Sequence, residues 1–115
     1  NDGVAESVVL YQETMNFEVT VARDGIAAIE AARRELPDVI LMDIQLPRLD
    51  GYEAIRRIRG IPSLEKTPII ALTGRAMPQE LERCLDAGAD LSMSKPYQML
   101  DLVHNMRQLL ASQAK

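Results

Sequence analysis

The chain has 115 residues, of which 47% are apolar and 26% charged, and its formal net charge at pH 7 is -4. This length suits one compact domain, and this composition excludes an intrinsically disordered or collagen-like chain. The negative charge and the lack of a basic block argue against direct contact with nucleic acid or an anionic membrane. With no apolar run long enough for a membrane span and no signal-peptide pattern, we expect a cytosolic domain.

The first third of the chain predicts a helix, a strand and a second helix. Apolar residues at helical spacing predict an opening amphipathic helix, and these residues are Val4, Val8, Tyr11 and Met15. Residues 17–22 read as a strand. Asp24 is a candidate N-cap for an alanine-rich helix over 26–35, which Pro37 ends.

Two runs in the middle of the chain, 39–42 and 68–72, are continuously apolar rather than alternating. Continuous apolarity is typical of parallel strands covered on both faces, so both runs are predicted strands. Between them, a loop over 45–51 that contains proline and glycine leads into a helix over 52–59.

The last third repeats the alternation of helix and strand. Pro78 suits the first turn of a helix, and Gly88 is a plausible stop for it. A short strand over 91–94 and a closing helix over 102–110 follow. Strands alternating with helices predict an α/β fold with a doubly wound parallel sheet.

Three polar residues directly follow predicted strands: Asp43, Thr73 and Lys95. In an open parallel sheet the ligand site lies beyond the carboxyl ends of the strands, so adjacent strands would bring all three to one edge. A carboxylate accepts a phosphoryl group as a nucleophile when nearby positive charge and hydroxyl donors stabilise the transferring group. Taken singly, each residue also suits an ordinary role, as a loop hydrogen-bonding group or a solvated surface charge.

The sequence motifs around these residues resemble those of the receiver domain of two-component response regulators. Residues 38–47 (DVILMDIQLP) with 50–53 (DGYE) resemble the phosphoacceptor strand and loop of that family. Later landmarks follow in family order and spacing, at 71–74 (ALTG), 87–90 (AGAD) and 94–96 (SKP). The resemblance covers roughly residues 17–110 and implies a flavodoxin-like fold with strand order 2-1-3-4-5.

The resemblance also implies roles for single residues. Asp43 would be the phosphorylation site, Thr73 the switch hydroxyl that reaches the phosphoryl group, and Lys95 its counter-charge. Asp43 and the backbone carbonyl of Gln45 would bind Mg²⁺, and an oxygen-only site suits that ion. The family's Lys–Pro bond is commonly cis, which makes the bond before Pro96 a candidate.

The chain departs from the family at two places. An ungapped alignment puts the family's first strand, and the acidic pair that ends it, before Asn1, so we expect four strands and an N-terminally incomplete single receiver domain over 1–115. Asp2 is the nearest acid but would lie past that pair. Ser92 stands where the family often has a switch aromatic, and Tyr97 is too far along to replace it.

Several other reactive or polar residues are expected to be structural. Cys84 lacks a disulfide partner and lies on an apolar helical stripe, which predicts a buried thiol. His104 is expected to be an ordinary helical histidine, and Arg33 and Arg34 a solvated helix face. Four methionines at apolar positions are expected in the core: Met15, Met42, Met93 and Met106.

Three functions compete at this stage. In the first, a sensor histidine kinase or histidine phosphotransfer domain phosphorylates Asp43 and switches an interaction surface, in a protein that stands alone or is fused to an effector or hybrid kinase. The second is a non-phosphorylated receiver-like interaction module, which Ser92 and the absent acidic pair would permit. The third, a flavin or nucleotide enzyme, lacks its glycine-rich phosphate loop. We therefore expect a signalling domain rather than an ordinary enzyme.

Overall fold

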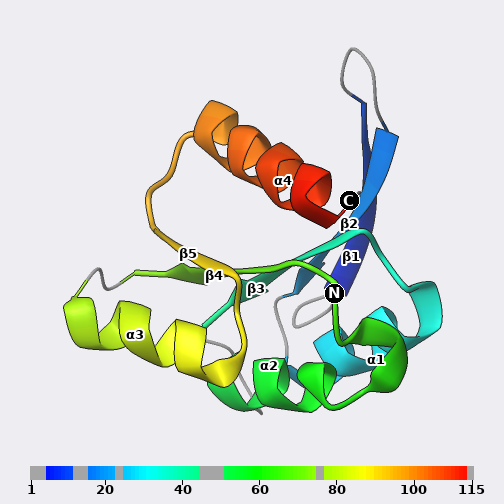
Figure 1. The fold of residues 1–115 in the computed structure, drawn as a ribbon, viewed down its shortest axis with the longest axis horizontal. Coiled ribbons are helices and arrows are strands. Elements are labelled where there is room, and N and C mark those ends of the chain that lie inside the picture. The colour runs from blue at the N-terminus through cyan, green and yellow to red at the C-terminus, as the bar shows by residue number, and fades with distance from the viewer. Residues whose placement is uncertain (1–4, 12–15, 23–24, 45–50, 75–76, 114–115) are drawn as a thin grey trace.

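The computed structural model describes residues 5–11, 16–22, 25–44, 51–74 and 77–113. These residues form one sheet with helices on both faces (Figure 1). The strands are β1 (Ala5–Tyr11), β2 (Asn16–Ala22), β3 (Val39–Asp43), β4 (Ile69–Thr73) and β5 (Leu91–Ser94). The helices are α1 (Gly25–Glu35), α2 (Gly51–Arg59), α3 (Pro78–Ala87) and α4 (Met99–Gln113), with a short 3-10 turn at Pro62–Leu64.

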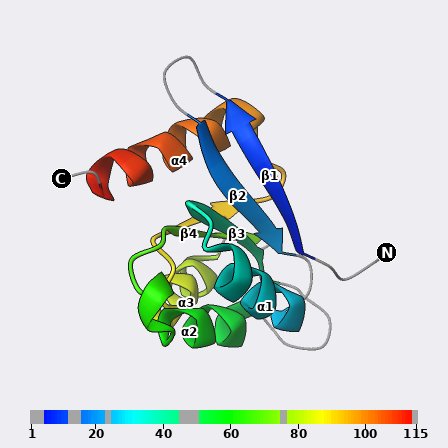
Figure 2. The same ribbon diagram turned by 90° about the vertical axis from the view of Figure 1, so that its right-hand side faces the viewer.

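The sheet has the order β1-β2-β3-β4-β5, and β2 to β5 run parallel. Among the described strands only β1, at the edge, is antiparallel to its neighbour (Figure 2). The parallel part confirms the predicted α/β class, and β3 and β4 are buried along nearly their whole length, as their continuous apolar sequences indicated.

Strand alternation divides the core into two layers. Ile40 and Met42 of β3 face α1, α2 and α3, whereas Val39 and Leu41 face α4. Figure 1 shows this arrangement directly, with three helices on one side of the sheet and α4 alone on the other. Both faces of the central strands are therefore covered, which makes the sheet doubly wound.

The predicted opening helix is wrong, because residues 5–11 form strand β1 and pair along β2. The segment with apolar residues at helical spacing also contains the consecutive apolar run Val8-Val9-Leu10-Tyr11. Its β-branched valines and its tyrosine suit a strand equally well. Pairing satisfies the backbone groups along one edge of β2, which would otherwise stay open.

The expected count of four strands is also wrong. The described residues form five strands, and β2 pairs directly with β3, with Val19 opposite Val39. The family order 2-1-3-4-5 would place another strand between these two. Here the backbone donors and acceptors along the facing edges of β2 and β3 satisfy each other directly.

The ends of the helices follow the predicted signals. Pro78 is the first residue of α3, and Gly88 closes that helix with φ 124°, a conformation that favours glycine. The backbone N–H of Gly88 donates to the carbonyls of Cys84 and Leu85. α1 ends at Glu35, just before Pro37, as expected, and Leu36 between them has φ 48°. The predicted N-cap Asp24 lies outside the described residues.

Arg59 ties the end of α2 to the starts of β4 and β5. Its guanidinium donates to the carbonyls of Gly88 (2.8 Å) and Thr67 (2.7 Å) and to Oδ2 of Asp90 (2.6 Å). The same Asp90 oxygen accepts the backbone N–H of Ile69 at 2.9 Å. The 87–90 landmark therefore has a structural role at the edge of the sheet opposite Asp43.

The residues expected to be structural lie where predicted. Cys84 is buried, and His104, Arg33 and Arg34 are exposed on their helices. Met42 and Met106 are fully buried and Met93 packs against the α4 layer, while Met15 lies outside the described residues. No helix in the described part of the chain is both long and apolar enough to cross a bilayer.

Candidate functional site

The carboxyl ends of β3, β4 and β5 meet at one edge of the sheet. Two backbone hydrogen bonds continue the strand pairing up to this edge, from Ile44 N–H to the Leu72 carbonyl (2.9 Å) and from Lys95 N–H to the Thr73 carbonyl (2.7 Å). Asp43 and Thr73 are the last residues of β3 and β4, and Lys95 directly follows β5. The structure therefore brings the three predicted residues to one edge.

Asp43 and Lys95 form an ion pair although 52 residues separate them in sequence. Lys95 Nζ lies 2.5 Å from Asp43 Oδ2, and the two side chains are 37% and 25% exposed. Partial exposure leaves the carboxylate accessible from solution, while the ammonium supplies positive charge beside it. The Lys95–Pro96 bond is cis, as the resemblance implied.

Thr73 lies at the same edge but is fully buried. It continues the alternation of Ile69 and Ala71, which places its side chain on the α1–α3 face of β4. The Asp43–Lys95 ion pair does not include it. The structure thus confirms the strand-end position of Thr73 and shows that its side chain is fully buried.

Gly51 fixes the first turn of α2 against the end of β3. Its N–H donates to the Ile44 carbonyl at 3.1 Å, directly after Asp43. A Cβ atom on Gly51 would lie 2.7 Å from Ile44 Cα and 2.9 Å from the Asp43 carbonyl oxygen, both backbone atoms that cannot give way cheaply. Only glycine lets the helix approach the end of β3 this closely.

Gly51→Ala is therefore expected to destabilise the fold by about 1–3 kcal/mol, because α2 must move away from β3. The measurement is the free energy of unfolding in urea. Gly60→Ala is the matched control at the other end of α2, where a Cβ would meet its nearest atom at an ordinary 3.5 Å. Equal losses for the two variants would contradict the close-approach explanation.

The described residues give an incomplete site for a divalent cation. Asp43 offers the hard oxygen ligand that Mg²⁺ prefers. Within the described ranges, no group of three or more acidic, histidine or cysteine residues is placed to hold a metal ion. The predicted ligand Gln45, and the nearby acid Asp2, lie outside the described residues. One carboxylate alone does not constitute a metal site.

A contact between α2 and α3 that the sequence did not predict lies beside this edge. The Tyr52 hydroxyl donates a hydrogen bond to Glu80 Oε1, and the Arg83 guanidinium lies 4.0 Å from the centroid of the Tyr52 ring. Tyr52 is only 6% exposed. Tyr52, Ile55 and Ile58 are buried residues on one face of α2, but no sequence signal linked that face to Glu80.

Burial, and next the hydrogen bond to Glu80, raise the pKa of Tyr52 from 10.0 to about 12. The protonated phenol is therefore favoured in the fold, and its stabilising contribution is present below pH 10 and lost as pH rises towards 12. A tyrosinate absorbance titration should contain a late step above pH 10, and Tyr52→Phe should remove that step. A titration curve whose late part is unchanged by Tyr52→Phe would contradict the buried contact.

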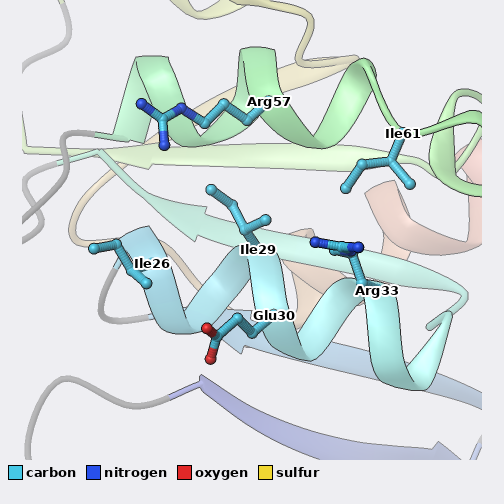
Figure 3. Close-up of a pocket in the computed structure, with 6 residues that line it drawn as sticks. All are labelled: Ile26, Ile29, Glu30, Arg33, Arg57 and Ile61. Carbon is cyan, nitrogen blue, oxygen red and sulfur yellow. The ribbon is translucent and has the colours of Figure 1, made fainter.

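A separate groove of about 420 Å³ lies between α1 and α2. Its described lining consists of Ile26, Ile29, Glu30, Arg33, Arg57 and Ile61, and Figure 3 shows Ile29 and Ile61 pointing into the space between the helices. The charged residues have both signs, and Arg57 already pairs with Glu53 at 3.1 Å. None of the residues that line the groove belongs to the site of Asp43, Thr73 and Lys95. Its mixed charges do not indicate whether a ligand would be an anion or a cation.

The fold and this edge define an α/β domain whose polar site lies at the carboxyl ends of parallel strands. The family model described as the response regulator receiver domain matches residues 1–107. The chain belongs to the response regulator receiver domain family.

Individual relatives agree with this assignment. Response regulator MprA of Mycobacterium leprae is 38% identical over 94 residues, which are 82% of this chain and 40% of that protein. The receiver domain of a sensor histidine kinase from Pseudomonas aeruginosa, solved with magnesium coordinated in its active site cleft, is 40% identical. It superposes with a TM-score of 0.72 over 78% of this chain and 74% of its own. The receiver domain of a histidine kinase from Syntrophus aciditrophicus is 33% identical, with a TM-score of 0.70 over 79% and 69% of the two chains.

Proposed function

We propose that Asp43 accepts a phosphoryl group, and that this chain is the phosphoacceptor switch of a two-component or phosphorelay protein. The observation that carries the proposal is the 2.5 Å ion pair between the Asp43 carboxylate and the Lys95 ammonium, at a partly exposed strand end. Family membership supports the same function. The chain spans about 40% of the length of its curated relatives, so the output of the whole protein is a separate matter.

The proposed step is an in-line transfer to a carboxylate oxygen of Asp43. The oxygen forms a bond to phosphorus while the bond from phosphorus to the donor's leaving group breaks, and the leaving group departs with that electron pair. The product is an aspartyl phosphate, whose added negative charge Lys95 neutralises. A later attack by water would return the carboxylate and free phosphate, so the domain signals without being an ordinary enzyme.

The donor and the metal ion belong to the same proposal. We propose a sensor histidine kinase or histidine phosphotransfer domain as donor, because sensor kinase receivers are among the relatives of this chain. Mg²⁺ is the proposed cofactor, with Asp43 and the Gln45 carbonyl as its ligands from residues 1–115. The Pseudomonas receiver supports this choice of ion by its bound magnesium.

Intact mass before and after incubation with acetyl phosphate tests the function, with and without Mg²⁺. A gain of one phosphoryl group that needs Mg²⁺ supports both the acceptor and the cofactor. A gain that is independent of Mg²⁺ would reject the cofactor alone. No gain under any condition would favour the non-phosphorylated interaction module.

Lys95→Met is expected to slow phosphorylation by acetyl phosphate about a hundred-fold, because the charge that stabilises the transferring group is lost. The initial rate of mass gain measures the effect. Lys66→Met is the control, since Lys66 is exposed and precedes β4, at the opposite edge of the sheet. If the Lys95 variant is phosphorylated as fast as the wild type, Lys95 does not act as the counter-charge.

A further inference from the structure

The helix α3 is joined to the phosphoacceptor edge by two routes. The first is the chain itself, because α3 begins five residues after Thr73, the last residue of β4. The second passes through space. Gly51 bonds to Ile44 beside Asp43, and the next residue, Tyr52, contacts Glu80 and Arg83 of α3. The two routes meet in the first two turns of α3.

Tyr52 contacts α3 through both its hydroxyl group and its aromatic ring. Its hydroxyl donates to Glu80, a partly buried acid in the first turn of α3. Its ring carries the guanidinium of Arg83, one turn further along, in cation–π geometry. Because Tyr52 is 6% exposed and Glu80 is partly buried, water competes little with the hydrogen bond, whereas Arg83 is exposed and its contact with the ring is the more solvated of the two.

Strand β5 offers no aromatic side chain for this task. Ser92, opposite Ala71 in the sheet, stands at the position where the family often has a switch aromatic. Tyr97 packs against the α4 layer, on the other side of the sheet from α3. Tyr52 is thus an aromatic residue that lies in the first turn of α2, next to the Gly51 that bonds to Ile44, and that also contacts α3.

We propose that Tyr52 is a positioning residue that couples the phosphoacceptor strand to α3 through Glu80 and Arg83. In the unphosphorylated domain the contact holds the start of α3. When Asp43 is phosphorylated, Thr73 moves towards the phosphoryl group. This movement displaces the first turn of α3, which follows Thr73 in the chain, and the Tyr52–Glu80 hydrogen bond breaks. The part of this inference that concerns the phosphorylated domain, its second state, rests on the proposed function. The part that concerns the contact in the unphosphorylated domain, its first state, does not.

Hydrogen exchange of α3 in the unphosphorylated protein tests the first state. Tyr52→Phe keeps the ring and its contact with Arg83 but removes the donor to Glu80, so α3 amides should exchange roughly ten-fold faster, as expected for loss of a hydrogen bond to a charged group. Amides of β3 and β4 should keep the wild-type rate. Tyr97→Phe is the matched control, since its hydroxyl has no hydrogen bond within the described chain.

A second variant removes the α3 partner of the same hydrogen bond. Glu80→Ala leaves Tyr52 packed and should produce the same increase, and the double variant should add nothing further, because both changes remove one bond. Unchanged α3 exchange in both single variants would overturn the proposal. An increase spread equally over α3, β3 and β4 would also overturn it, since that pattern indicates general destabilisation.

The second state is tested with acetyl phosphate present throughout. Phosphorylation should speed α3 exchange in the wild type, and the ratio of phosphorylated to unphosphorylated rates should fall towards one in Tyr52→Phe. Mass spectrometry of the same samples shows whether the phosphoryl group is bound, so failure of the proposed function appears as absent mass gain. A phosphorylated Tyr52→Phe protein that keeps the full wild-type ratio would show that the contact does not couple the two sites.

Discussion

Asp43→Asn is expected to gain no phosphoryl group from acetyl phosphate under conditions in which the wild type gains one. The amide keeps the shape of the side chain and an oxygen that accepts from Lys95, but it lacks the anionic oxygen that attacks phosphorus. The change therefore removes the reaction and the charge of Asp43 while it leaves the geometry at this edge nearly unchanged. Intact mass measured over time gives the result directly.

Asp38→Asn is the control for this experiment. Asp38 is exposed and lies just before β3, at the opposite end of the strand that Asp43 ends. This variant should be phosphorylated at the wild-type rate. If Asp43→Asn still gains a phosphoryl group, peptide mapping would identify another acceptor, and the assignment of Asp43 would have to be abandoned.

Arg59→Met is expected to cost about 3 kcal/mol of unfolding free energy, the largest stability effect that we predict. Methionine keeps much of the apolar stem of the side chain but leaves the carbonyls of Gly88 and Thr67 without their donor. It also takes away the charge paired with Asp90, which in turn holds the start of β4 at Ile69. Urea unfolding monitored by circular dichroism measures the loss.

Arg57→Met provides the comparison on the same helix. Arg57 is 56% exposed and pairs only with Glu53 among the contacts described, so its loss should stay within about 0.5 kcal/mol. Arg59→Lys should fall between the two, since one ammonium cannot donate in the geometry of a guanidinium. Equal effects of the Arg57 and Arg59 changes would mean that the network at Arg59 contributes no more than a surface ion pair.

Local signals explain why so much of the fold was predictable from the sequence. The apolar runs of β3 and β4 can be satisfied only by burial on both faces, and Gly88 and Pro78 act on backbone conformations within their own turn. Because parallel strands align their carboxyl ends, the positions of Asp43 and Lys95 after two such strands predicted their meeting.

Contacts between segments distant in sequence explain what could not be predicted. Residues 5–11 are compatible with a helix or a strand, and only the open edge of β2 decides between them. The direct pairing of β2 with β3 depends equally on which edges are available. Arg59 and Tyr52 each look like ordinary residues of α2, and their roles arise from partners 31 and 28 residues away. The sequence by itself therefore determined the buried strands and the site at their carboxyl ends. Tertiary packing decided how β1 and β2 pair at the side of the sheet, and it decided the contacts that hold α2 and α3 around that site.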